Sequence, residues 1–180
     1  MKGSVTVHMN ARADQVWNLI ADICNTPKYS PEVFESEWLD GATGPALGAL
    51  FRGHVKRNEI GPIYWTTCRV TACEPGREFG FAVLAGDKAV NNWHYALAPA
   101  GDGTDVTETF WMTPGLLDTV FGIFGGQLRT RRNIRDMRTT LNRIKAEVES
   151  KIDDEFAKNL GLESIDQLRG LLRGQLEQET

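Results

Sequence analysis

The stretch that decides the fold is residues 77–113, REFGFAVLAGDKAVNNWHYALAPAGDGTDVTETFWMT. Apolar and polar residues alternate in three runs, which are separated by Gly86-Asp87 and by the segment 99–103. Alternation with a period of two is typical of β-strands, and such short connections can join only antiparallel neighbours. This stretch therefore predicts three consecutive antiparallel strands at 77–84, 89–98 and 104–113.

The same pattern continues toward the N-terminus. Turn-forming Gly, Pro and Asp residues separate three further predicted strands, at 33–40, 46–58 and 63–73. A seventh alternating run at 3–10 precedes a helical pattern from Ala13 to Cys24 and a short turn or second helix at 28–31. The spacings leave no room for crossover helices, so we expect a single antiparallel sheet.

A long helical pattern follows the last strand, from Pro114 to Val148. Glycines at 122, 125 and 126 interrupt it, and we expect a bend there. A last amphipathic helix is predicted at 162–176. This order of elements predicts an α+β helix-grip fold, in which a seven-stranded antiparallel sheet curls around a long C-terminal helix, with two short helices after the first strand. We divide the chain into a helix-grip domain, 1–152, and a C-terminal helical extension, 153–180.

Composition excludes several classes of protein. The chain has 180 residues, with 20 Lys and Arg against 24 Asp and Glu, and this acidic balance argues against a dedicated nucleic-acid binder. Neither a signal peptide nor an apolar run long enough to span a bilayer is visible. The cysteines Cys24, Cys68 and Cys73 show no zinc-site spacing, and alternation puts the last two on opposite faces of one strand. We expect free thiols, a cytoplasmic protein, no metal and no cofactor.

Several short segments, in this order, resemble a known family. They are ADQVWNLIAD (13–22) followed by Tyr29-Ser30-Pro31, GALFRG (48–53), EPGREF (74–79), and WHYALAP (93–99) with GTDVTE (103–108). Together they are similar to the polyketide cyclase/dehydrase and lipid-transport family of the START-like, birch-pollen-allergen superfamily (SRPBCC), over roughly residues 3–150. The resemblance implies a hydrophobic cavity between sheet and helix, and it carries over no catalytic set.

Alternation also predicts which side chains face such a cavity. One face of each strand is rich in aromatic residues and would point toward the long helix. With residues from the helical segments, the candidate ligand-binding residues are Tyr29, Phe51, Phe79, Phe81, Trp93, Tyr95, Leu97, Glu108, Phe110, Leu117, Phe121 and Phe124. The alternative interpretation is that these side chains fill a solid core.

Glu108 is the most informative single residue. It alternates with Val106 and Phe110, so a carboxyl group falls on the apolar face, where a charge is costly unless it is paired or protonated. Tyr95 or Arg69 could satisfy it. Glu108 could therefore be half of a structural pair, be turned outward by a bulge, anchor a ligand, or act as an acid or base.

Three functions remain open on this evidence. The first is binding or transport of a small hydrophobic ligand of the lipid, polyketide or isoprenoid type, and the second is a cyclase or dehydratase that uses Glu108 and Tyr95. The third is an interaction module that uses the C-terminal extension and an arginine-rich stretch, 129–145, whose simpler interpretation is a solvated helix face. We expect an apolar small molecule as partner and no specific nucleic acid; a homodimer and peripheral membrane contact stay open.

Overall fold

The computed structural model describes residues 1–56, 61–113, 126–167 and 169–170. The strands are β1 (Lys2–Met9), β2 (Val33–Trp38), β3 (Leu50–Lys56), β4 (Ile63–Glu74), β5 (Glu78–Ala85), β6 (Lys88–Ala100) and β7 (Gly103–Met112). The helices are α1 (Ala13–Ala21), the short 3-10 turn η1 (Ile23–Asn25), α2 (Thr26–Tyr29) and α4 (Gly126–Asn159).

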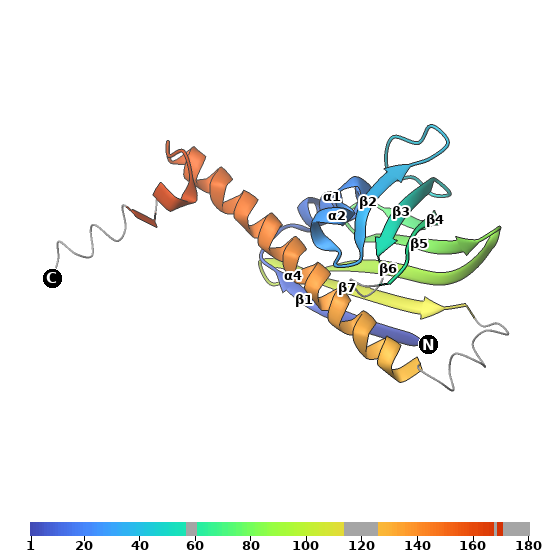
Figure 1. The fold of residues 1–180 in the computed structure, drawn as a ribbon. Helices are drawn as coiled ribbons and strands as arrows, with labels where there is room; N and C mark the ends of the chain where they lie inside the picture. The colour runs from blue at the N-terminus through green and yellow to red at the C-terminus, as the bar shows by residue number, and fades with distance from the viewer. Residues whose placement is uncertain (57–60, 114–125, 168, 171–180) are drawn as a thin grey trace.

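The strands form one seven-stranded antiparallel sheet in the order β1-β7-β6-β5-β4-β3-β2. The strands from β2 to β7 follow one another as a meander, and β1 adds to the free edge of β7. Figure 1 shows the sheet curled beside α4, with β1 lying along the helix and the C-terminal part of α4 extending beyond the sheet. The predicted helix-grip fold is confirmed.

Two contacts explain how the first helix is placed. The backbone N–H of Arg12 donates a hydrogen bond to the side-chain oxygen of Gln15, 3.2 Å away, and this begins α1. The indole N–H of Trp17 donates to the backbone oxygen of Glu78 on β5 at 2.9 Å. Because Val16 and Ile20 are buried on the same side of α1, the helix closes one end of the curled sheet.

The long helix packs through one apolar stripe. Met137, Leu141, Ile144 and Val148 recur every three or four residues and are all buried. The helix continues to Asn159, past the predicted domain boundary at 152. The bend expected at Gly122 and Gly125 lies outside the described residues, as does most of the last predicted helix; residues 165–167 and 169–170 are helical. None of the described helices is long and apolar enough to cross a bilayer.

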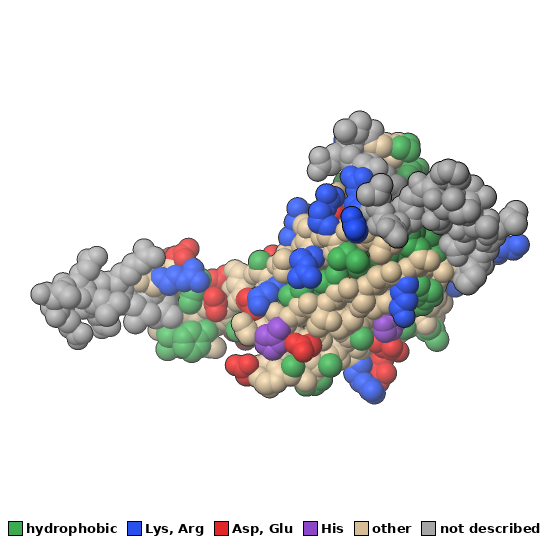
Figure 2. All heavy atoms as spheres, turned by 90° about the horizontal axis from the view of Figure 1, so that it is seen from below, with side chains coloured by type: hydrophobic (Ala, Val, Ile, Leu, Met, Phe, Trp, Pro, Cys, Tyr) green, Lys and Arg blue, Asp and Glu red, His purple; other side chains and the backbone are tan. Residues whose placement is uncertain are grey.

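Several basic side chains of the arginine-rich stretch contact the rest of the chain. Arg143 donates a hydrogen bond to the backbone oxygen of Tyr29 at 3.2 Å, and Lys145 donates to that of His8 at 2.8 Å. Arg135 forms an ion pair with Asp136 at 2.9 Å. Figure 2 shows Lys and Arg side chains on the face along which α4 runs. Arg143 and Lys145 therefore contact other segments of this chain, whereas Arg135 pairs with its neighbour on α4 and stays exposed.

One sequence prediction about the cysteines is wrong. The pairing between β4 and β5 shifts between Val70 and Ala72, so one residue is inserted into the alternation. As a result Cys73 lies opposite Phe79 and, like Cys68, packs on the core side of the sheet. All three cysteines are free thiols, as expected.

Candidate ligand cavity

A cavity of about 460 Å³ lies between the inner face of the sheet, the short helices and the N-terminal half of α4. This volume falls within the range of small-molecule pockets. The sheet contributes aromatic and small side chains, among them Phe51, Cys68, Phe81 and Trp93, while Met137 and Thr140 come from α4. The cavity exists because the curved sheet leaves more space in front of β3–β6 than the stripe of α4 fills.

Six of the candidate ligand-binding residues line this cavity. They are Phe51, Phe79, Phe81, Trp93, Tyr95 and Glu108. Three of the rings pack against one another: Phe81 meets Phe51 edge to face, with ring centres 5.2 Å apart, and Phe79 at a tilt, with ring centres 6.2 Å apart. The predicted inner face of the sheet is therefore also the wall of the cavity.

Three other candidates are buried elsewhere and do not belong to the cavity wall. Phe110 lies at the β1 edge, beside Gly3 and below α4, so the helix covers it. Leu97 lies near the end of β6, where α1 contacts the sheet. Tyr29 is the last residue of α2; it is buried, and its backbone oxygen accepts a hydrogen bond from Arg143 of α4. The remaining candidates, Leu117, Phe121 and Phe124, lie outside the described residues.

A buried pair of polar side chains forms the centre of the wall. Tyr95 and Glu108 lie directly opposite each other on β6 and β7. The hydroxyl of Tyr95 donates a hydrogen bond to Oε1 of Glu108 at 2.9 Å, and only 3% of Glu108 is exposed. Oε2 of Glu108 is buried without a hydrogen-bond partner among the described residues. Tyr95, and not Arg69, is thus the partner of the acid, and it satisfies one of its two oxygens.

Burial controls the protonation of this pair. Loss of hydration raises the pKa of Glu108 from 4.5 to about 8, although the hydrogen bond from Tyr95 acts in the opposite direction. Burial, and then the neighbouring Glu108, raise the pKa of Tyr95 well above 10. At neutral pH Glu108 is therefore mostly a carboxylic acid. Since Oε1 accepts from Tyr95, its own O–H is available at Oε2.

Sequence reasoning missed Asn91 as a wall residue. Asn91 shares its face of β6 with Trp93 and Tyr95, and its side-chain oxygen is buried without a partner among the described residues. The same alternation that selected Trp93 would have selected it. Cys68 was also missed, and burial raises the pKa of its thiol to about 12, so this thiol is not a nucleophile at neutral pH.

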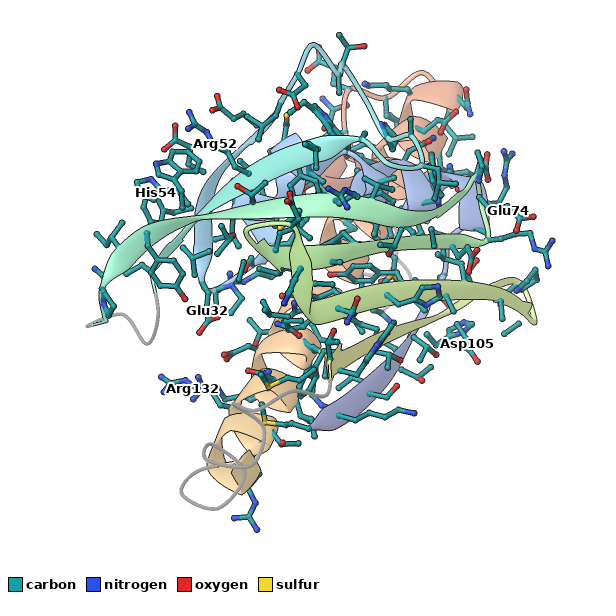
Figure 3. All side chains as sticks on the ribbon, turned by 90° about the vertical axis from the view of Figure 1, so that its right-hand side faces the viewer. Glu32, Arg52, His54, Glu74, Asp105 and Arg132 are labelled. Carbon is teal, nitrogen blue, oxygen red and sulfur yellow. The ribbon has the colours of Figure 1, made fainter. Side chains whose placement is uncertain are left out.

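The three histidines lie outside the cavity wall. His8 pairs with Asp105, His54 with Glu35 and His94 with Glu78, at distances of 2.8 to 3.1 Å. Figure 3 shows His54 and Arg52 extending from the outer side of the sheet, away from α4. Within the described residues, no three His, Cys, Asp or Glu side chains are grouped so that they could hold a metal ion.

Curated proteins match this chain only over short parts of their length. The chain is 60% identical over 40 residues to the trigger factor of Erythrobacter litoralis, which is 22% of this chain and 8% of that protein. It is 36% identical over 96 residues to the trigger factor of a Bradyrhizobium species, covering 44% of this chain and 21% of that protein. These two matches thus span 8% and 21% of the relatives' length, and they show local similarity.

Solved structures resemble nearly the whole domain. A polyketide cyclase-like protein from Corynebacterium glutamicum shares 25% identity at a TM-score of 0.53, over 86% of this chain and 93% of its own. The protein TTHA0849 from Thermus thermophilus has a TM-score of 0.65 at 16% identity, over 84% and 99% of the two chains. The two-domain aromatase/cyclase StfQ of the steffimycin biosynthetic pathway has a TM-score of 0.64 at 14% identity, over 84% and 51%. At such identities the last two show the fold alone.

A family profile covers the part of the chain that builds the sheet, the cavity and most of the packed portion of α4. It matches residues 1–149 and describes polyketide cyclases, dehydrases and lipid-transport proteins. Together with the curled sheet, the long helix and the largely apolar cavity wall, this match shows that the chain belongs to the polyketide cyclase/dehydrase and lipid transport family.

Proposed function

We propose that this protein binds a small hydrophobic molecule, of the lipid, polyketide or isoprenoid type, in the cavity between the sheet and α4. The observation that carries the proposal is a cavity of about 460 Å³ whose wall is mainly apolar and aromatic. This wall contains one buried hydrogen-bonded pair, Tyr95 and Glu108. Each Å² of apolar surface that a ligand buries there contributes roughly 25 cal/mol, which favours binding without any charged contact.

Filling the cavity is expected to abolish this binding. Thr66 lines the cavity, whereas the next residue, Thr67, is exposed on the opposite face of β4. In Thr66→Phe the new ring occupies the space of a ligand, so the affinity for the neutral apolar dye N-phenyl-1-naphthylamine should fall at least about tenfold. Dye fluorescence, titrated against the full chain, measures the dissociation constant.

Thr67→Phe serves as the matched control, because it adds the same ring to the same strand. The control should bind the dye like the natural chain. Equal binding by Thr66→Phe, with circular dichroism showing that both variants are folded, would place the dye elsewhere and contradict the proposal. Lack of dye binding by the natural chain would contradict it as well.

A cyclase or dehydratase activity is the second candidate function, and the Tyr95–Glu108 pair favours it. An acid whose pKa is about 8 can both give and take a proton near neutral pH. In a dehydration, the ionised form of Glu108 would take a proton from the carbon beside a ketone. It would return that proton to the departing hydroxyl group, so that water leaves and Glu108 regains its charge.

This second function has its own test. The β-hydroxy ketone 4-hydroxy-4-phenylbutan-2-one loses water to form a conjugated product that absorbs in the near ultraviolet. If the chain is such an enzyme, it should accelerate this reaction. The Glu108→Gln substitution should then reduce the rate about a hundredfold or more, since general acid–base catalysis contributes 10²–10⁴-fold. An equal rate with and without the natural chain would leave binding as the function.

A further inference from the structure

The cavity wall presents hydrogen-bonding groups that the protein itself does not satisfy. Oε2 of Glu108 and the side-chain oxygen of Asn91 are both buried and lack a partner among the described residues. A buried polar group without a partner costs roughly 1–3 kcal/mol, and a ligand that supplies the partner recovers this cost. The two groups therefore indicate what kind of polar atom the ligand carries.

The charge of the wall is equally informative. Among the described residues that line the cavity there is no Lys, Arg or His, while three carry a carboxyl group, namely Glu32, Glu108 and Asp136. Arg132, on α4, extends outward in Figure 3, whereas Glu32 lies between the sheet and the helix. Among the described residues, a carboxylate or phosphate ligand would therefore lose its hydration without gaining a cation from the wall, since Arg135, which pairs with Asp136, does not line the cavity itself.

Building on the proposed binding function, we propose that the cavity selects an uncharged apolar ligand that carries a carbonyl or ether oxygen. This oxygen accepts a hydrogen bond from the O–H of Glu108. Carboxylate ligands of the same shape are rejected. Tyr95 is the positioning residue, because its hydrogen bond to Oε1 leaves the proton of the acid at Oε2. Asn91 lies four residues from Tyr95 along β6, about 13 Å away at ~3.3 Å per residue, and its Oδ1 would accept a hydrogen bond from an N–H or O–H at the other end of a ligand that carries one.

The same arrangement makes binding depend on pH. The titratable side chains that share the wall with Glu108 come from the sheet, from α4 and from the segment before β2: Tyr95 on β6, Tyr64 and Cys68 on β4, Asp136 on α4, and Glu32. On β1, the residue paired with Glu108 is the apolar Val5. Ionisation of Glu108 above its pKa of about 8 removes the donor and adds a charge to the wall. A neutral ligand that does not titrate should then bind more weakly as the pH rises.

Three probes with one naphthalene ring test the selection: 2-acetonaphthone, 2-naphthoate and 2-naphthylmethylamine. At pH 6.5 we expect the full chain to bind the ketone at least tenfold more tightly than either charged probe, as measured by calorimetry. In Glu108→Leu the ketone should lose about tenfold in affinity, whereas Glu108→Gln, whose amide N–H can donate in place of the acid, should keep most of it. At pH 9.5 the natural chain should bind the ketone roughly thirtyfold more weakly, because the neutral form of Glu108 becomes a minor species; Glu108→Gln should show no such change.

The outcomes separate this inference from the proposed function. If the apolar dye binds and Thr66→Phe abolishes its binding, but the naphthoate or the amine equals the ketone, the selection for neutral ligands is wrong while the binding function stands. Unchanged ketone affinity in Glu108→Leu would equally overturn the role of the acid. If neither the dye nor any naphthalene probe binds the folded natural chain, the binding function itself fails.

Discussion

Glu108→Gln is expected to be more stable than the natural chain at pH 8, with a free energy of unfolding up to about 5 kcal/mol higher. At pH 4 the two free energies of unfolding should be nearly equal. In the unfolded chain the carboxyl group titrates near its usual 4.5, whereas burial raises its pKa in the folded protein to about 8. Between these values the unfolded state releases a proton that the folded state retains. The stability contributed by neutral Glu108 is complete below pH 4.5, falls as the pH rises, and is lost by about pH 8.

Urea unfolding at several pH values between 4 and 9 measures this difference. Glutamine keeps the acceptor for the hydroxyl of Tyr95 but has no proton to lose, so its unfolding free energy lacks this dependence on pH. Glu74→Gln is the control, since Glu74 is exposed at the end of β4 and forms an ion pair with Arg77, which is also exposed. If the profiles of Glu108→Gln and the natural chain run parallel, Glu108 is not held neutral by the fold.

This prediction also bears on function. A buried acid that lowers the free energy of unfolding at neutral pH destabilises the protein unless a ligand forms a hydrogen bond with it. A ligand that accepts its hydrogen bond stabilises the folded state by mass action and offsets the cost. We therefore expect excess 2-acetonaphthone at pH 7 to stabilise the natural chain by more than it stabilises Glu108→Leu, which should bind the ketone about tenfold more weakly.

Phe110→Ala is expected to cost about 3–5 kcal/mol of stability, the usual loss when a fully buried phenylalanine is truncated. Phe110 is 0% exposed, and its ring lies 5.5 Å from that of Trp93, measured between ring centres. It also fits against Gly3, where a Cβ atom would come within 2.6 Å of the ring. Because β1, β7 and α4 all pack around this ring, these elements cannot move together far enough to fill the cavity that the substitution leaves.

Trp111→Ala is the matched control for this change. Trp111 is the next residue on β7, but it points to the other face of the sheet and is 38% exposed. Truncating it removes a larger side chain, yet it should cost only about 1 kcal/mol, because little of the surface lost was buried in the core. Equal losses, measured by chemical unfolding followed by circular dichroism, would contradict the assignment of the two faces.

The alternation in residues 77–113 was enough to predict three strands and the side to which their residues point, except where the pairing of β5 with β6 shifts between Val83 and Leu84. It placed Glu108 on the apolar face and offered Tyr95 as its partner, and the structure brings these two side chains within hydrogen-bond distance. Such inferences succeed because the period of two is a property of the strand backbone itself, and antiparallel neighbours joined by short turns keep a simple register.

Other features depend on tertiary structure alone. The inserted residue near Val70, which turns Cys73 toward the core, follows from the pairing of β4 with β5 and leaves no mark in the alternation. Whether an inward side chain lines the cavity, like Phe81, or packs solidly, like Phe110, depends on where α1 and α4 cross the sheet. The same is true of the absence of Lys, Arg and His from the described part of the cavity wall, and of the Glu108 oxygen that has no partner among the described residues. A strand pattern records only which way a side chain points, whereas an empty space is defined by the distance between segments far apart in the chain.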